Sequence, residues 1–254
     1  MRGDLLGKMG QGQEQGVRHK KVGTRRRVLI IFAVVMIPCA VLAILNHIRA
    51  NRSIEGVPEP IQVDIVEWKQ RAAKNGEQVD TEKTIGGMGY GVDMRFLAHY
   101  DIKGLVVAVD DYDNKWNATA FDKAIPRDIS LAWGKVAANK NRFKWSHGPR
   151  KLSVGYGGDV LAQLGLSRGQ IMSQVSNNHL LVDDDKLYRA IKKVRVGDYI
   201  KMEGYLISAT IMDDSGNAVR DVRSSLVRTD FSSSVLDRKT SCEIMYVTDL
   251  QWLD

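Results

Sequence analysis

A few residues of this sequence have the chemistry of a catalytic site. The pair at 146–147 (Ser-His) and His179, which is followed by three aspartates at 183–185, supply the hydroxyl, imidazole and carboxylate groups that nucleophilic hydrolases use. Their spacing matches no hydrolase signature, because the sequence has no Gly-x-Ser-x-Gly turn, no Ser-x-x-Lys motif and no zinc-binding helix. We therefore interpret His179 as a hydrogen-bonding group that fixes a turn at 177–178, and a periplasmic hydrolase using His179 is the alternative.

Three aromatic residues are candidates for binding a ligand. Trp133, Trp145 and Tyr156 could stack on sugar rings or on a partner protein, with His179 as a further contact residue. Aromatic residues in strands usually belong to the core, which is the competing interpretation. A membrane-tethered module that binds a saccharide or another oligomeric ligand on an aromatic barrel face is therefore an alternative function.

The two cysteines do not predict a redox or metal site. Cys39 lies inside an apolar run that we assign to the membrane below, and Cys242 lies near the C-terminus, so the two cannot pair within one chain. The sequence has neither Cys-x-x-Cys nor His-x-x-His spacing, which argues against thiol redox chemistry and zinc. We expect Cys242 to be a buried thiol, with an intermolecular disulfide as the alternative, and we expect no metal and no cofactor.

Most of the segments that would position these residues are predicted strands. Alternating apolar residues from 99 to 112 are typical of a strand. Three shorter extended runs follow it, beginning at Asp128, Arg142 and Ser176. Apolar positions at helical spacing then predict a helix from 183 to 197, with the aspartates capping its N-terminus and Gly197 ending it in a left-handed conformation.

The order of these elements predicts the fold class. A long amphipathic strand begins at Tyr199 and contains Gly204, which indicates a bulge or a sharp bend, and two further extended segments begin at Val222 and Ser241. We therefore predict an α+β, mostly β fold: an N-terminal transmembrane helix followed by a small Greek-key (OB-like) barrel with one helix between strands 3 and 4. We expect the glycine-rich stretch from 85 to be a flexible connector. The one between 148 and 168 is expected to be a loop with a helical turn at 160–164.

An uncleaved membrane anchor is predicted near the N-terminus. Residues 28–45 are eighteen consecutive apolar positions without a charge, which at about 1.5 Å per residue nearly span a hydrocarbon core of about 30 Å. No convincing signal-peptidase site follows them, so a cleaved signal peptide is the weaker alternative. Arg25, Arg26 and Arg27 precede the run, and positive residues stay on the cytoplasmic side.

The charge of the chain is concentrated in the same region. The sequence has 37 Lys and Arg and 30 Asp and Glu, of which residues 1–45 hold eight and two, so the remainder is close to neutral. A nucleic-acid-binding domain would carry its basic excess on its folded part. We therefore expect the lipid bilayer as a partner, through residues 28–45, and no nucleic acid.

These features divide the chain into five predicted parts. They are a basic cytoplasmic tail (1–27), a transmembrane helix (28–46), a linker (47–60), an N-terminal extension of the outer domain (61–98) and a periplasmic OB-like β domain (99–254).

From His99 onward the chain also resembles a group of bacterial single-pass envelope proteins of unassigned function. The segments that carry the resemblance are DISLAWGKV, RFKWS, SNNHLLV, KVRVGDYIKMEGYLI, and RSSLVRTD with CEIMYV. They correspond to an L-x-W-G segment, an aromatic–Trp pair, an N-x-H-L segment, a basic helix into Gly-Asp, a Gly-x-Leu strand, and S-L-x-R followed by C-E. Between 230 and 241 this chain is longer than the compact turn of the group, so that connection is expected to protrude.

The resemblance implies a bacterial inner-membrane protein with a periplasmic domain, and it transfers no catalytic residue. We therefore expect a single-pass protein whose β domain acts without catalysis, by protein–protein interaction with an envelope partner or by self-association. The near-neutral domain, the single tether and the lack of a cofactor motif all agree with this expectation.

Overall fold

The structure, a computed structural model, forms two compact units, residues 1–47 and 48–254. The described residues are 34, 36–45, 48, 59–148, 150–226 and 242–253. Within the first unit, residues 34 and 36–45 are helical, and no helix among the described residues is both long and apolar enough to span a bilayer. The remaining predictions for this region lie outside the described residues: the tail with Arg25, Arg26 and Arg27, the rest of the anchor, and most of the linker.

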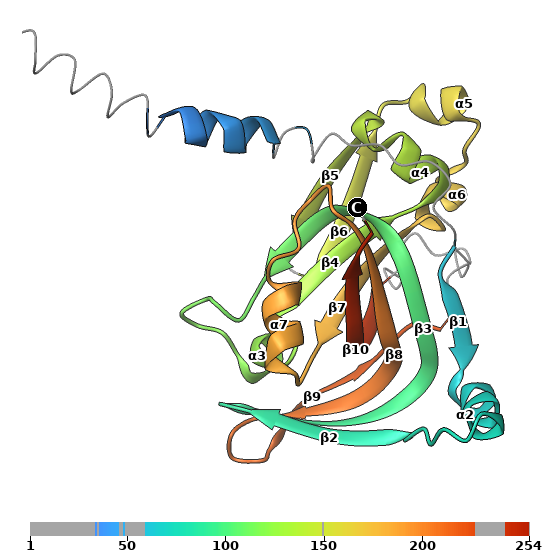
Figure 1. Cartoon of the computed structure of the whole chain (residues 1–254), viewed down its shortest axis with the longest axis vertical. Helices are drawn as coiled ribbons and strands as arrows, with labels where there is room; N and C mark the ends of the chain where they lie inside the picture. The colour runs from blue at the N-terminus through green and yellow to red at the C-terminus, as the bar shows by residue number, and fades with distance from the viewer. Residues whose placement is uncertain are drawn as a thin grey trace, which may run out of the picture. The chain divides into compact units, whose positions relative to one another are not determined.

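The second unit is mostly β, as predicted (Figure 1). Its strands are β1 (Ile61–Asp64), β2 (Glu82–Gly87), β3 (Tyr90–Asp111), β4 (Arg127–Ala132), β5 (Phe143–Gly148), β6 (Lys151–Tyr156), β7 (Val175–Leu181), β8 (Tyr199–Met212), β9 (Ala218–Arg223) and β10 (Cys242–Trp252). Its helices are α2 (Ile65–Lys74), α3 (Ala120–Ala124), α4 (Gly134–Ala138), α5 (Val160–Leu164), α6 (Arg168–Met172) and α7 (Asp185–Ile191), with a 3₁₀ turn at Lys140–Arg142.

Five of the strands pair in a closed ring. β3 pairs with β4, β4 with β7, β10 with β8 and β8 with β3, all antiparallel, whereas β7 and β10 are parallel. α7 connects β7 to β8. Figure 1 shows the long strands β3 and β8 curving together out of the ring into a sheet that they form with β2 and β9.

The strand β3 crosses the predicted boundary between an extension and the barrel. It has 22 residues, so position 98 lies inside one ring strand. The first half of β3 pairs with both β2 and β8, and the second half pairs with β4 and β8, with a register shift between Phe96 and Ala98. The residues before 99 are therefore an integral part of the sheet.

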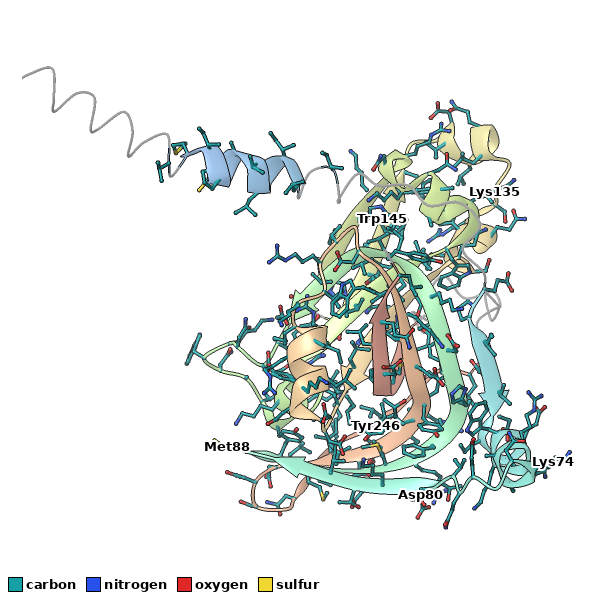
Figure 2. All side chains as sticks on the ribbon, in the orientation of Figure 1. Lys74, Asp80, Met88, Lys135, Trp145 and Tyr246 are labelled. Carbon is teal, nitrogen blue, oxygen red and sulfur yellow. The ribbon has the colours of Figure 1, made fainter. Side chains whose placement is uncertain are left out.

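The glycine-rich stretch from 85 is a β-hairpin, so the prediction of a flexible connector is wrong. Gly86 pairs with Gly91 and Gly87 with Tyr90, which leaves Met88 and Gly89 as the turn. Gly89 has a φ of 81°, a conformation that favours glycine, and this glycine therefore permits the tight reversal. Met88 is 94% exposed at the tip (Figure 2).

The predicted loop between 148 and 168 is wrong in its first half. Residues 151–156 form β6, which pairs antiparallel with β5 and turns Val154 and Tyr156 toward the main core. Its second half contains α5, which occupies the predicted helical turn at 160–164. Alternation in KLSVGY is the signal for this strand, and the glycines at 155, 157 and 158 hide it.

Two apolar clusters stabilise the unit. The first fills the ring and includes Tyr100, Leu105, Leu131 and Met202. The second lies on the other side of the β3–β8 sheet, around Phe96 and Ile207, where residues of α2 and α3 cover it. Along β8 buried and half-buried residues alternate, and its two halves bury opposite faces, the first against the ring cluster and the second against the other cluster.

The predicted helix is present as α7, although only one of its three aspartates caps it. The side chain of Asp184 accepts a hydrogen bond from the backbone N–H of Leu187 at 2.6 Å, whereas Asp183 forms an ion pair with Lys83. Gly197 has a φ of 95°, the left-handed conformation that was expected of it.

Candidate functional site

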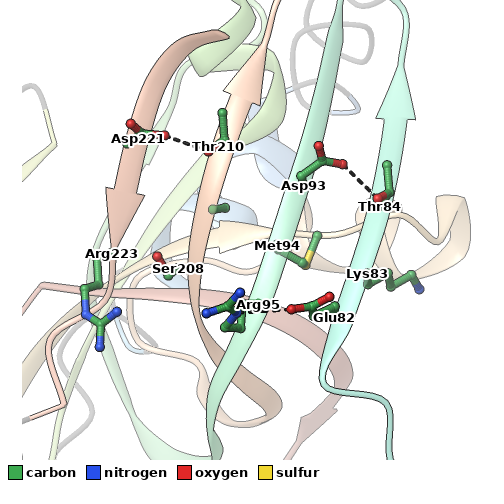
Figure 3. A pocket seen from close by; sticks show the side chains of 11 residues that line it. Glu82, Lys83, Thr84, Asp93, Met94, Arg95, Ser208, Thr210, Asp221 and Arg223 are labelled. Atoms are coloured by element: carbon green, nitrogen blue, oxygen red, sulfur yellow. Dashed lines mark hydrogen bonds and ion pairs between the residues drawn. The ribbon is translucent and has the colours of Figure 1, made fainter.

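An open trough of about 510 Å³ lies on the sheet of β2, β3, β8 and β9 (Figure 3). Its polar side chains form two rows that cross the four strands, because residues paired between neighbouring strands lie side by side. We name them the basic row, consisting of Glu82, Arg95, Ser208 and Arg223, and the acidic row, consisting of Thr84, Asp93, Thr210 and Asp221.

The two rows differ in charge. In the basic row, Arg95 pairs with Glu82 at 3.2 Å, and Arg223 makes no ion pair with a described residue. In the acidic row, Asp93 and Asp221 accept hydrogen bonds from threonine hydroxyls at 2.8 and 2.6 Å and face no cation in their row. The trough therefore presents one positive and one negative strip to solvent.

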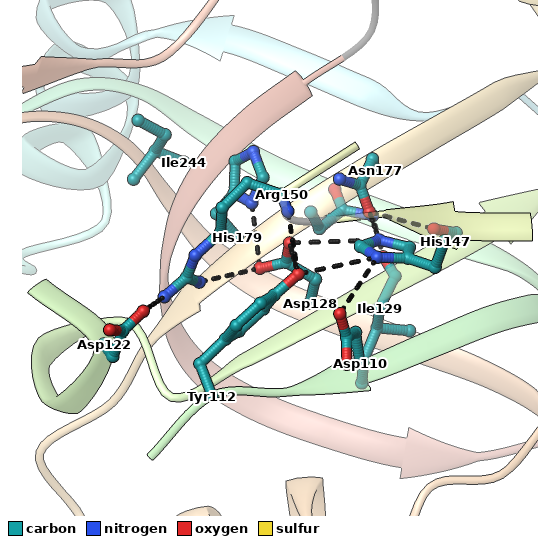
Figure 4. Close-up of polar contacts among 12 residues, drawn as sticks. Asp110, Tyr112, Asp122, Asp128, Ile129, His147, Arg150, Asn177, His179 and Ile244 are labelled. Carbon is teal, nitrogen blue, oxygen red and sulfur yellow. Dashed lines mark hydrogen bonds and ion pairs between the residues drawn. The ribbon is translucent and has the colours of Figure 1, made fainter. Parts of the chain in front are cut away.

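A buried carboxylate, Asp128 of β4, is the centre of a second polar group, on the outer side of the ring (Figure 4). Its Oδ1 accepts a hydrogen bond from Nη1 of Arg150 at 3.1 Å and lies 2.8 Å from Nδ1 of His179. Its Oδ2 accepts a hydrogen bond from the hydroxyl of Tyr112 at 3.2 Å and lies 3.8 Å from Nε2 of His147. These contacts compensate the cost of burying the charge.

Arg150 joins three segments at this cluster. Its φ of 59° is rare for a residue other than glycine. Its guanidinium bridges Asp128 and Asp122 of α3, at 3.1 and 3.0 Å, and lies over the ring of Tyr112, 3.6 Å from the centroid. These contacts offset the backbone strain and hold the β5–β6 hairpin against the connection from β3 to β4.

His147 of β5 and Asn177 of β7 meet beside Asp128. Nε2 of His147 lies 3.0 Å from Oδ1 of Asn177, which also accepts a hydrogen bond from the hydroxyl of Ser130 at 2.9 Å. The amide nitrogen of Asn177 is buried and has no hydrogen-bond partner among the described residues. Leaving a buried donor unpaired costs about 1–3 kcal/mol.

His179 lies between Asp128 and Cys242. In the parallel β7–β10 pair, Cys242 is opposite Asn177 and Ile244 is opposite His179, which places Cys242 and His179 on the same face. Burial lowers the pKa of His179, but hydrogen bonds and charge interactions with Asp128 and Cys242 outweigh burial and raise the pKa to about 9, so the ring is cationic at neutral pH.

This pKa makes the stability of the domain depend on pH. The folded-state pKa of His179 lies above its ordinary value, so its contribution is complete below about pH 6.5 and is lost as the pH rises through about 9. Between these limits, the free energy of unfolding of the full chain in detergent micelles should fall by roughly 3 kcal/mol more than that of His179→Gln. Urea titrations of both proteins at about pH 6.5 and about pH 9 measure the difference. If the free energy of unfolding changed equally with pH in the two proteins, the raised pKa would not belong to His179.

The remaining polar residues of β7 face the ring interior. Asn178 donates to the backbone carbonyl of Ile129 at 3.1 Å, and the hydroxyl of Ser176 bonds to Asn178 and to the carboxylate of Glu243. Residues 177 and 178 thus lie within a buried strand and point to opposite faces. The prediction that they form a turn held by His179 is therefore wrong.

The structure separates the four residues predicted to contact a ligand. Trp133 is 1% exposed in the main core, so it has no face available for stacking. Trp145 and Tyr156 are half-buried against the same core, and the indole N–H of Trp145 donates to a backbone carbonyl at 3.0 Å. Among the four, only His179 belongs to the cluster around Asp128.

Sequence reasoning missed Asp128, Arg150 and Asn177 as members of one site, and it treated Cys242 as a buried thiol. Cys242 is half-buried, and like Cys39 it is free. One signal was present in the sequence: Ser-Asn-Asn-His interrupts an apolar run between Val175 and Leu180. Consecutive polar residues inside a buried strand indicate polar partners on both faces of the sheet.

No protein-family model, no curated protein and no solved structure matches this chain. Within the described part of the chain, no group of three or more His, Cys, Asp or Glu side chains could hold a metal ion. The function is therefore argued from the geometry of the trough and of the Asp128 cluster.

Proposed function

We propose that this chain is a bacterial single-pass inner-membrane protein that binds another envelope protein through the trough of its outer domain. Residues 1–27 lie in the cytoplasm, 28–46 cross the bilayer and the β domain lies in the periplasm. The apolar run and the arginines before it support this location, as does the resemblance to bacterial envelope proteins.

The β domain is an OB-like barrel. The ring order β3-β4-β7-β10-β8, the parallel pair β7–β10 and the position of α7 between the third and fourth ring strands support this assignment. OB folds often bind ligands on the face of their second and third strands, which here are β4 and β7. Side chains of the chain's own β5–β6 hairpin contact that face, because His147 bonds to Asn177 and Arg150 to Asp128.

The observation that carries the proposal is the pair of oppositely charged rows on an open sheet. Arg223 has no anionic partner among the described residues, and the two aspartates of the acidic row have only threonine hydroxyls. A partner with acidic side chains over the basic row and basic side chains over the acidic row would complement both strips. Such an interface orients its partner, and its affinity falls with salt.

Charge reversal tests this binding. Arg223→Glu in a tagged full chain should reduce the recovery of the partner from detergent-solubilised envelopes about tenfold, which corresponds to about 1.4 kcal/mol of binding free energy. Quantitative mass spectrometry of cross-linked, affinity-purified samples measures the recovery against the parent chain.

The matched control is Lys186→Glu, which reverses an exposed charge on α7 outside the trough and should leave recovery unchanged. Recovery of the parent chain alone, or equal losses for the two variants, would count against the trough as the binding surface. Recovery of the intact chain in the soluble fraction before detergent is added would instead contradict the membrane anchor.

A further inference from the structure

The charged rows of the trough repeat the same pair of residue types on two strands. Arg95 and Asp93 lie two residues apart on β3, and Arg223 and Asp221 lie two residues apart on β9. Residues at this spacing point to the same face of a strand, about 7 Å apart. The strand between them, β8, contributes only uncharged hydroxyl side chains to the rows. Each arginine of the basic row therefore has an aspartate beside it in the acidic row (Figure 3).

The charges of both rows are accessible to a binding protein. The two arginines and the two aspartates are exposed. Threonine hydroxyls hold the carboxylates at 2.8 and 2.6 Å, which fixes their direction without neutralising them. Among the described residues Arg223 makes no ion pair, and the pair of Arg95 with Glu82 has side chains that are 70% and 66% exposed. Such an exposed pair contributes little, so Arg95 can accept a second carboxylate as a partner.

The arrangement of the rows has a symmetry consequence. When two copies of this face meet across a twofold axis that runs along the rows, midway between them, each basic row lies over the acidic row of the other copy. The strand positions are retained, so Arg223 faces Asp221 of the second copy and Arg95 faces Asp93 of the second copy. Each contact then occurs twice, as in any isologous interface. A twofold axis along the strands would instead lay like rows over each other, so the charges select the first arrangement.

We propose that the trough is self-complementary and that two copies of this chain form a symmetric dimer through it when no other protein occupies it. The inference rests on the proposed function in one respect, that the trough is a protein-binding surface, and it adds that this surface also recognises itself. The rows match a second copy because they present two arginines and two aspartates at the facing positions, so neither sign is left in excess there. An envelope partner and a second copy would contact the same residues and therefore exclude each other.

The dimer contact is polar. Water can fill the space that the two open troughs enclose, as it does in many polar interfaces. Salt weakens such a contact, since the screening length falls from about 10 Å at 0.1 M to about 3 Å at 1 M. We therefore expect a reversible dimer that forms at low salt and dissociates at high salt.

The test uses the purified full chain in detergent micelles, with micelles in excess over chains and no other protein present. Two versions that differ only in their affinity tag are mixed, and the recovery of one with the other measures association at about 0.05 M and about 1 M salt. The parent should associate at low salt and lose most of this association at high salt. Lys186→Glu, which reverses an exposed charge on α7 outside the trough, should associate as the parent does.

Charge reversal within the trough should abolish and then restore the dimer. Arg223→Glu and Asp221→Arg should each weaken self-association at least about tenfold, because each replaces two attractive contacts by two contacts between like charges. When Arg223→Glu is mixed with Asp221→Arg, both contacts again join opposite charges, so association between the two variants should return close to that of the parent. This return also shows that both variants are folded.

Three results would overturn the dimer: a parent that is monomeric at low salt, an Arg223→Glu variant that associates as the parent does, or a mixture of folded variants without restored association. Near-ultraviolet circular dichroism reports folding. If a variant of the first pair is not folded, Arg95→Glu with Asp93→Arg makes the same test on β3. Because no envelope partner is present, none of these results contradicts the proposed function, which the recovery of that partner tests separately.

Discussion

Asp128→Ala is expected to lower the free energy of unfolding by about 3–5 kcal/mol, because it leaves two largely buried cations without their shared carboxylate. Nη1 of Arg150 and Nδ1 of His179 both lie within 3.1 Å of its Oδ1. The hydroxyl of Tyr112 loses its acceptor as well. Urea unfolding of the full chain in detergent micelles, followed by tryptophan fluorescence, measures the change.

Two further variants test whether the loss of stability is specific to the ion pairs of Asp128. Asp93→Ala removes an exposed carboxylate bonded to Thr84 and should cost less than about 1 kcal/mol. The double variant Asp128→Ala/Arg150→Met should cost less than the sum of its single variants, because it removes both the anion and one of the stranded cations. A cost below about 1 kcal/mol for Asp128→Ala would contradict the role of this cluster in stability.

Gly204→Ala is expected to destabilise the domain by about 3 kcal/mol or more, because a Cβ at this position would lie 2.0 Å from the backbone oxygen of Tyr246 and 3.1 Å from the backbone nitrogen of Thr248. Both are main-chain atoms of β10, so relief requires movement of the strand. The register of the β8–β10 pair already shifts between Val247 and Asp249, opposite this glycine. Denaturant unfolding gives the free energy, and hydrogen exchange should show the largest loss of protection in β10.

The matched control is Gly155→Ala, also in a strand. There the nearest atom to a new Cβ is Cβ of Lys144 at 3.5 Å, an ordinary contact. This change should alter the free energy of unfolding by less than about 0.5 kcal/mol. If the two substitutions cost the same, the close approach of β10 to Gly204 is not what constrains this position.

Much of the fold could be predicted from local patterns. Alternation identified the second half of β3 and the whole of β8, short extended runs identified β4, β5, β7 and β10, and helical spacing identified α7. The bend expected at Gly204 corresponds to a close approach of β10, with the bulge on the partner strand. Where glycines interrupt the pattern, in the β2–β3 hairpin and in β6, the prediction was wrong, because glycine obscures alternation without preventing pairing.

The candidate site could not be predicted in the same way. Tyr112, Asp128, Arg150, His179 and Cys242 come from five separate segments, and each had a reasonable local interpretation by itself. Their meeting depends on which strands pair and in which register. A shift of one residue in the β7–β10 pair would turn Cys242 to the opposite face from His179.

The sequence by itself determined the positions of most strands, the helix before β8, the mostly β character of the second unit and the concentration of positive charge before residue 28. These properties arise from neighbours in the chain, whose periodic side chains select a local conformation. Only the tertiary structure decided that the strands close into a ring, that charged rows line the trough, and that an imidazole and a guanidinium meet one buried carboxylate. Those arrangements depend on long-range pairing, whose register is set by the packing of apolar side chains throughout the domain.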